Sequence, residues 1–362
     1  MRHPSILALT LLACPPLIAQ TSGVLLGYWD TGWREEHRTL WIHHSGDHAA
    51  AEVIPGLIIP RQAGFWHMGK YFTMSAEDEA DEEHLWAAPS NRRPAMTLAD
   101  GEHFSQGWEN GLCERISREV HFVGPSYISY TLQTEASCGV HPDGESELRV
   151  ASLDQLEGDR IPASRFLGPA APPAIREAVA RVEGSDCFEK PHVDERNWQI
   201  TRRQGHWSAE GWAATHRLCG YGVEFAIGLP LPESVVGYDR LPADWTTLKQ
   251  SIPGLFDAFG SPTGDMIIAT TEKDLQVYRL EHGKLGRMIL RRTWTQLHMD
   301  SGDDWERLPL VMAQWATGPN VARWTRELHQ AERASGPVSR PVVSPSPRPA
   351  APAPPPSSAP DR

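Results

Sequence analysis

Apolar and polar residues alternate along two neighbouring stretches of the chain, residues 116–122 and 128–133. A Gly124-Pro125-Ser126 turn sequence lies between them. Alternation with a period of two is typical of strands with one buried face, and a short turn between two such strands predicts a hairpin. Apolar side chains face each other across this hairpin only if even-numbered residues pair, for example Val120 with Tyr130.

A second hairpin is predicted over residues 197–212, with Gln204-Gly205 as its two-residue turn. This turn pairs Arg202 with Trp207 and Ile200 with Ala209. The sequence that follows supplies a third strand with alternating apolar residues, Val223, Phe225 and Ile227.

Two more hairpins and two helices complete the prediction. The hairpins span residues 38–54, turning at 45–47, and residues 264–286, turning near 273–274. The helices span residues 172–184 and 318–334, because apolar residues recur there at helical spacing after an initial proline. We therefore expect a β-rich α+β fold of antiparallel sheets built from successive hairpins, with a few packed helices. A β-propeller-like all-β fold is the alternative, although no repeat of blade length is visible.

The two ends of the chain have the composition of processing and tail segments. Residues 1–19 combine Arg2, a short apolar run and small residues, which is typical of a secretory signal peptide cleaved after Ala19. In the alternative, Cys14 is lipid-modified and anchors the protein by its N-terminus. Both routes predict an exported protein, periplasmic or secreted. Residues 336–362 are rich in proline, alanine and serine and predict a disordered tail. Between the ends we expect an N-terminal β-rich region at 20–110 and a main α+β domain at 111–335.

The net charge of −12 limits the classes of partner. An acidic chain argues against nucleic acid and favours a basic protein as a partner. No apolar run after the signal is long enough to span a membrane.

Four cysteines remain beyond Cys14, namely Cys113, Cys138, Cys187 and Cys219. An even number in an exported protein predicts two disulfides, and three pairings are possible. Proximity in the sequence favours Cys113 with Cys138, although the predicted register places these two on opposite faces of the hairpin. Cys187 and Cys219 bracket the second hairpin.

Residues 135–148 read EASCGVHPDGESEL and contain the catalytic candidates His141, Asp143 and Glu145. Acid–base catalysis needs paired groups in a dry cleft, whereas these three lie around a proline and a glycine typical of an exposed turn. The chain contains no nucleophile-elbow, zinc-protease, phosphate-loop or dinucleotide-binding motif, and we predict no cofactor. The absence of these motifs favours a protein that is not an enzyme.

Three histidines near the first hairpin turn, His43, His44 and His48, are the candidate metal ligands. Imidazole suits zinc, copper or nickel, and the alternative is an exposed polar turn. The acidic stretch 77–83 lacks the spacing of a calcium loop and reads as a solvated segment that attracts basic partners. Trp198, Trp207 and Trp212 belong either to the core or to a surface that stacks on carbohydrate.

The order of features in residues 120–182 resembles the extracytoplasmic domain shared by the lysozyme-sensing anti-sigma factor RsiV and the peptidoglycan deacetylase PdaC. Three segments carry the resemblance: Gly139-Val140-His141, the turn Glu157-Gly158 and Arg165-Phe166-Leu167. The resemblance implies an extracytoplasmic domain that binds proteins, such as lysozyme, or cell-wall glycan. It transfers no catalytic residue.

Taken together, these features predict an exported, non-catalytic binding or sensing protein of the bacterial cell envelope. The alternative is an envelope hydrolase or deacetylase that acts on cell-wall polymer.

Overall fold

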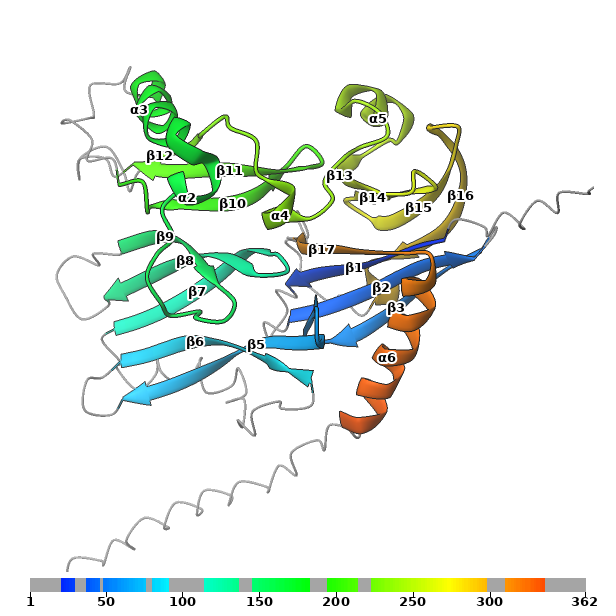
Figure 1. Ribbon diagram of the computed structural model, residues 1–362, viewed down its shortest axis with the longest axis horizontal. Coiled ribbons are helices and arrows are strands. Elements are labelled where there is room, and N and C mark those ends of the chain that lie inside the picture. The colour runs from blue at the N-terminus through cyan, green and yellow to red at the C-terminus, as the bar shows by residue number, and fades with distance from the viewer. Residues whose placement is uncertain are drawn as a thin grey trace, which may run out of the picture.

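The computed structural model describes residues 21–29, 37–45, 48–75, 80–90, 114–136, 145–182, 194–213, 223–297 and 310–335. These residues form four sheets with few helices, arranged in a propeller-like ring (Figure 1). The predicted β-rich architecture of successive hairpins is confirmed. The α+β assignment holds only in part, because the helices are few and lie around the sheets.

Sheet A joins the two ends of the described chain. Its four antiparallel strands lie in the order β17 (Leu310–Thr317), β1 (Ser22–Trp29), β2 (His37–Ser45) and β3 (His48–Pro55). The strand β17 pairs with β1, so the last strand closes the ring against the first. The predicted hairpin at residues 38–54 is β2–β3, in which Ser45 lies opposite His48.

Sheet B has six strands, in the order β4 (Leu57–Arg61), β5 (Gly64–Ser75), β6 (Ala80–Pro89), β7 (Glu114–Val123), β8 (Tyr127–Ala136) and β9 (Glu145–Ser152). The pair β6–β7 is parallel and the others are antiparallel. Val120 faces Tyr130 as predicted, with a bulge between Val120 and Phe122. The predicted domain boundary at 110/111 lies outside the described residues, and strands from both sides of it form this sheet.

Sheets C and D are antiparallel. Sheet C contains β10 (Trp198–Arg203), β11 (His206–Ala213) and β12 (Val223–Ala226). Its register confirms the predicted pairs of Arg202 with Trp207 and Ile200 with Ala209. Sheet D contains β13 (Leu255–Gly260), β14 (Met266–Thr271), β15 (Asp274–Glu281) and β16 (Lys284–Thr293).

The helices pack against the sheets at three of the four apolar cores. They are α2 (Ser164–Leu167), α3 (Ala171–Val182), α4 (Glu233–Val236), α5 (Trp245–Ser251) and α6 (Pro319–Ser335), with short 3-10 turns η2 (Gly168–Ala170) and η4 (Thr295–Leu297). The two predicted helices correspond to α3 and α6. No helix in the described ranges is both long and apolar enough to cross a membrane.

Alternate residues of sheet A pack against different neighbours. Leu25 and Trp41 contribute to a core shared with sheet B and α6, whereas Leu26 and Ile42 contribute to a core shared with sheet D. A third core joins sheets B and C with α3 and α4, and a fourth lies between sheet D and α5. None of these four clusters of described residues joins sheet C to sheet D. The seam between sheets C and D is instead joined by polar contacts.

Candidate functional site

The seam between sheets C and D is built on one arginine. Arg202 of β10 projects from the same sheet face as Ile200 and Trp207, which is otherwise apolar. Its guanidinium Nε donates to Asp257 Oδ2 of β13 at 2.6 Å, and Nη1 donates to Asp239 Oδ1 at 3.0 Å. The arginine side chain is only 6% exposed. It therefore forms a buried ion-pair network, in which each charge has a partner.

The guanidinium is also held by backbone and aromatic groups. Its Nη2 donates to the carbonyl oxygens of Gly205 at 2.8 Å and Ala258 at 2.5 Å. The guanidinium carbon lies 3.7 Å from the ring centroid of Phe259 and 5.0 Å from that of Trp207. Planar stacking of this kind suits arginine and not lysine.

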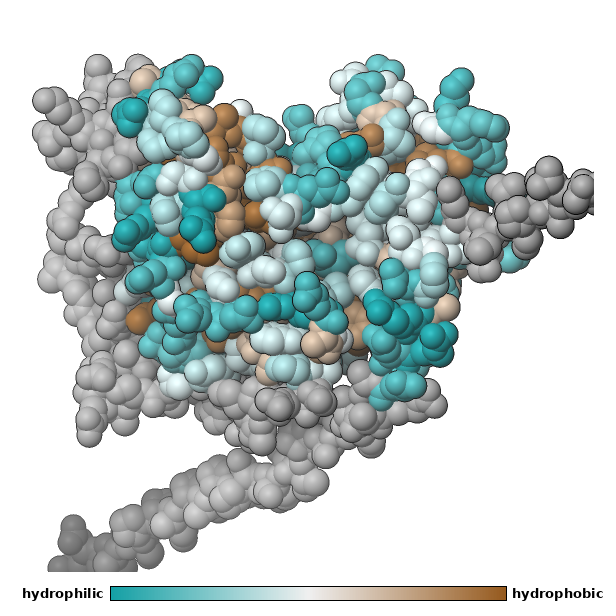
Figure 2. All heavy atoms as spheres, viewed as in Figure 1, coloured by the Kyte–Doolittle hydropathy of each residue, from teal (hydrophilic) through white to brown (hydrophobic). Residues whose placement is uncertain are grey.

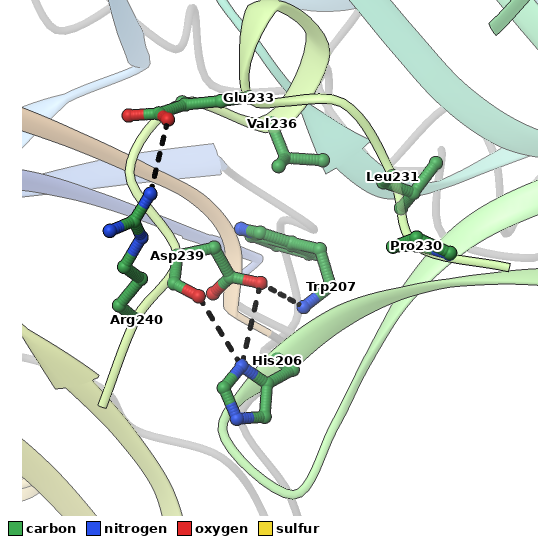
Figure 3. Close-up of a pocket in the computed structure, with 9 residues that line it drawn as sticks. His206, Trp207, Pro230, Leu231, Glu233, Val236, Asp239 and Arg240 are labelled. Carbon is green, nitrogen blue, oxygen red and sulfur yellow. Dashed lines mark hydrogen bonds and ion pairs between the residues drawn. The ribbon is translucent and has the colours of Figure 1, made fainter. Parts of the chain in front are cut away.

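Asp239 connects this network to an open pocket. The pocket has a volume of about 490 Å³ and is lined by His206, Trp207, Pro230, Leu231, Glu233, Val236, Gly237, Asp239 and Arg240 (Figure 3). Its walls come from the β10–β11 hairpin and from the connection between sheets C and D that contains α4. In Figure 2 the upper edge of the molecule is indented between the part that carries α3 and the part that carries α5.

The position of Asp239 follows from close packing of this connection. A Cβ atom at Gly260, at the end of β13, would lie 2.4 Å from the carbonyl oxygen of Arg240. Only glycine lets the connection pass so close to the strand. The main-chain N–H of Trp207 then donates to Asp239 Oδ2 at 2.7 Å.

His206 and Asp239 form the central polar pair of the pocket. The His206 ring atom Nδ1 lies 3.3 Å from the carbonyl oxygen of Asp239 and 3.8 Å from its Oδ2. The interaction with Asp239 raises the pKa of His206, although partial burial and Arg202 oppose the change. Burial acts to raise the pKa of Asp239, but the bonds from His206, Arg202 and the Trp207 N–H outweigh it and lower that pKa.

The rim of the pocket carries a loose pair of opposite charges. Glu233 Oε2 and Arg240 Nη2 lie 3.8 Å apart, and both side chains are exposed. A pair this exposed contributes little to stability, so a ligand can replace it at small cost. Pro230, Leu231 and Val236 form an apolar wall beside it. The pocket thus offers positive, negative and apolar contacts together.

The predicted metal ligands do not come together. His44 Nε2 lies 2.6 Å from Asp265 Oδ2 of sheet D, whereas His43 stacks on Trp41 with ring centroids 5.5 Å apart. His43 and His44 point to opposite faces of β2, as neighbours in a strand must. His48 is exposed. The described residues contain no group of three or more histidine, cysteine, aspartate or glutamate side chains placed to hold a metal.

Most of the other predicted site residues lie outside the described part of the chain. The residues outside it are His141, Asp143, Cys14, Cys113, Cys138, Cys187 and Cys219. Glu145 is the first residue of β9, but its side chain is not described. Part of the acidic stretch 77–83 is buried, contrary to the expectation of a solvated segment. Glu83 is 2% exposed and pairs with Lys70 at 2.5 Å.

Trp198 and Trp207 belong to the core, as one of the two interpretations predicted. The site residues His206, Asp239, Glu233 and Arg240, and Arg202 behind them, were not predicted from the sequence. One signal was present for Arg202: a charged residue on the apolar face of an alternating strand requires a buried partner. No protein-family model matches the chain, and a search of curated proteins finds no match.

Proposed function

We propose that this protein is an exported, non-catalytic binding protein of the bacterial cell envelope, and that the His206 pocket is a ligand site. The observation that carries the proposal is the composition of the pocket. It combines an apolar wall, a replaceable Glu233–Arg240 pair and a histidine fixed from behind by Asp239 and Arg202. The nine lining residues include no serine, threonine, cysteine or lysine, and the Asp239 carboxylate is already occupied by Arg202 and the Trp207 N–H.

Rigid support behind the pocket favours binding. Asp239 and Asp257 are fixed on both sides of Arg202, so His206 and the main chain of Trp207 need little ordering when a ligand arrives. A preformed site loses less conformational entropy on binding. Acidic composition and the predicted signal peptide support a basic envelope protein, such as lysozyme, or cell-wall glycan as the partner.

Titration calorimetry of the mature protein with a c-type lysozyme, and separately with soluble peptidoglycan fragments, tests the proposal. We expect saturable binding of at least one of them that persists at moderate salt, because contacts inside a pocket are screened less than surface charges. H206A and R240A should each weaken it about tenfold. H48A, which removes an exposed histidine of sheet A that does not line the pocket, is the matched control. Failure of the mature protein to bind either ligand, or equal loss in H48A and H206A, would refute the proposal.

An envelope hydrolase or deacetylase is the second candidate. The pair of His206 and Asp239 favours it, since a base oriented by a carboxylate is a common catalytic arrangement. Release of acetate or of reducing sugar ends from peptidoglycan by the wild type, abolished in H206A and D239N, would support this candidate over simple binding.

A further inference from the structure

Two accessible side chains of opposite charge lie next to each other at the rim of the pocket. Glu233 is 66% exposed and Arg240 is 75% exposed. Asp239, the other carboxylate of the pocket, is only 15% exposed and accepts hydrogen bonds from Arg202 and the Trp207 N–H. A ligand that enters the pocket therefore meets one accessible carboxylate, that of Glu233, and one accessible guanidinium, that of Arg240.

The short distance between these two charges limits the charge of the ligand. Glu233 Oε2 and Arg240 Nη2 lie 3.8 Å apart, so a charge that binds one of them also interacts with the other. An anion bound to Arg240 is repelled by Glu233, and a cation bound to Glu233 is repelled by Arg240. A ligand with both an ammonium group and a carboxylate pairs with the two side chains at once. The rim therefore favours a zwitterion over an ion of either sign.

The remaining walls of the pocket favour a peptide over a sugar. In Figure 3 the charged pair lies on one side of the pocket, and Pro230 and Leu231 lie on the other. An apolar wall of this kind suits an aliphatic side chain. The indole of the pocket, Trp207, is 5% exposed, and its ring contacts Phe122 and the guanidinium of Arg202. This indole therefore has no open face on which a sugar ring would stack.

We propose that the pocket binds a short peptide with free ends. Its ammonium group pairs with Glu233, its carboxylate pairs with Arg240, and an aliphatic side chain packs on Pro230 and Leu231. The pocket volume of about 490 Å³ lies within the range of roughly 300–1,000 Å³ that is typical of small-ligand sites. The two charged side chains are long and exposed, so they follow the ends of the peptide at small cost. The inference rests on the proposed function and narrows its ligand to the peptide class.

Calorimetric titration of the mature protein with alanyl-leucine, its N-acetyl derivative and its C-terminal amide tests the inference. Acetylation removes the ammonium group of the peptide and amidation removes its carboxylate. Each modification should weaken binding to the wild type about tenfold, because it leaves one charge of the rim without a partner. Glycyl-glycine keeps both charged ends but lacks an aliphatic side chain, and it should also bind about tenfold more weakly than alanyl-leucine.

Two variants assign each end of the peptide to its side chain. E233Q removes the partner of the ammonium group, so it should bind the free and the acetylated peptide equally well. R240Q removes the partner of the carboxylate, so it should bind the free and the amidated peptide equally well. E327Q is the matched control, because Arg323 and Glu327 form an exposed pair on α6 at 3.9 Å that does not line the pocket. It should keep both differences, and thermal unfolding confirms that each variant is folded.

The outcomes separate this inference from the proposed function. Loss of the acetylation effect in E233Q and of the amidation effect in R240Q, with both effects kept in E327Q, supports the inference. Equal binding of the free and the acetylated peptide by the wild type would show an anion site and overturn it. If no peptide binds, while lysozyme or peptidoglycan fragments bind and binding weakens in H206A, the inference is overturned and the proposed function stands. Failure of every ligand to bind overturns both.

Discussion

Two charged side chains each connect neighbouring sheets through several polar partners. Arg202 connects sheets C and D, and Asp265 performs the same task between sheets D and A. Asp265 accepts hydrogen bonds from Ser261 and Thr263, both at 2.6 Å, and contacts His44 at 2.6 Å. Burial acts to raise the pKa of Asp265, but these bonds outweigh it and lower the pKa to about 2.

The lowered pKa of Asp265 predicts a loss of stability in acid. The folded-state pKa lies below the ordinary value of 3.8, so the stabilisation is complete above about pH 4 and disappears as the pH falls toward about 2. The expected contribution is about 2 kcal/mol. Urea unfolding at about pH 5 and about pH 2 should show a smaller drop for D265N than for the wild type. D154N, which alters an exposed carboxylate, should keep the wild-type drop, and equal drops in D265N and the wild type would contradict the argument.

The β10–β11 hairpin shows how a local turn positions the site. Gln204 and Gly205 both have positive φ, 51° and 79°, as a two-residue turn of this kind requires. The turn places His206 at the pocket, and the carbonyl oxygen of Gly205 accepts a hydrogen bond from Arg202.

Substitution of Gly205 should therefore disturb stability and binding together. In G205A the added Cβ would meet Leu241 Cδ1 at 2.6 Å in addition to the strained φ, and we expect a loss of about 1–3 kcal/mol. Gly283 turns the β15–β16 hairpin with a φ of 75° and has no atom within 4 Å of the Cβ position. G283A is thus the matched control for strain alone. Chemical unfolding should show the larger loss in G205A, and equal losses would exclude the contact with Leu241 as a cause.

Local elements were predictable from the sequence because their signals lie within about twenty residues. The pairs of Val120 with Tyr130 and Arg202 with Trp207 follow from alternation and turn residues alone. The parallel contact of β6 with β7 and the pairing of β17 with β1 leave no such signal. Only half of the site could be predicted from local signals. His206 belongs to a predicted hairpin, whereas Asp239 lies in a connection whose sequence has no periodic pattern. The metal hypothesis placed three histidines together by proximity, although the strand directs His43 and His44 to opposite faces.

At the scale of the whole molecule, sheet A connects sheet B to sheet D. Its two faces contribute to two different cores, and β17 supplies buried residues to both, including Met312 and Ala313. The helix α6 continues from β17 and packs Trp324 against Trp41 and Phe65. Loss of this one segment removes contacts from two of the four clusters.

A chain that ends before β17, at residue 309, should not fold cooperatively. It loses the strand that pairs with β1 and the apolar residues that β17 and α6 contribute to two cores. The stabilising free energy of these contacts should exceed the roughly 5–15 kcal/mol by which a domain is typically stable. Thermal unfolding followed by near-ultraviolet circular dichroism should show no sharp transition. A chain that ends at residue 335 keeps β17 and α6 and is the control, expected to unfold like the full chain. A sharp transition in the shorter chain would show that the pairing with β1 is dispensable.

The pairing of β1 with β17 also determines when folding can finish. Ser22 lies opposite Thr317, so β1 pairs with a strand that is synthesised almost 300 residues later. Until β17 has been synthesised, β1 has an unpaired edge and the two cores that sheet A shares are incomplete. Contacts so distant in sequence form slowly. Sheet A and its two cores are therefore completed only after β17 has been synthesised.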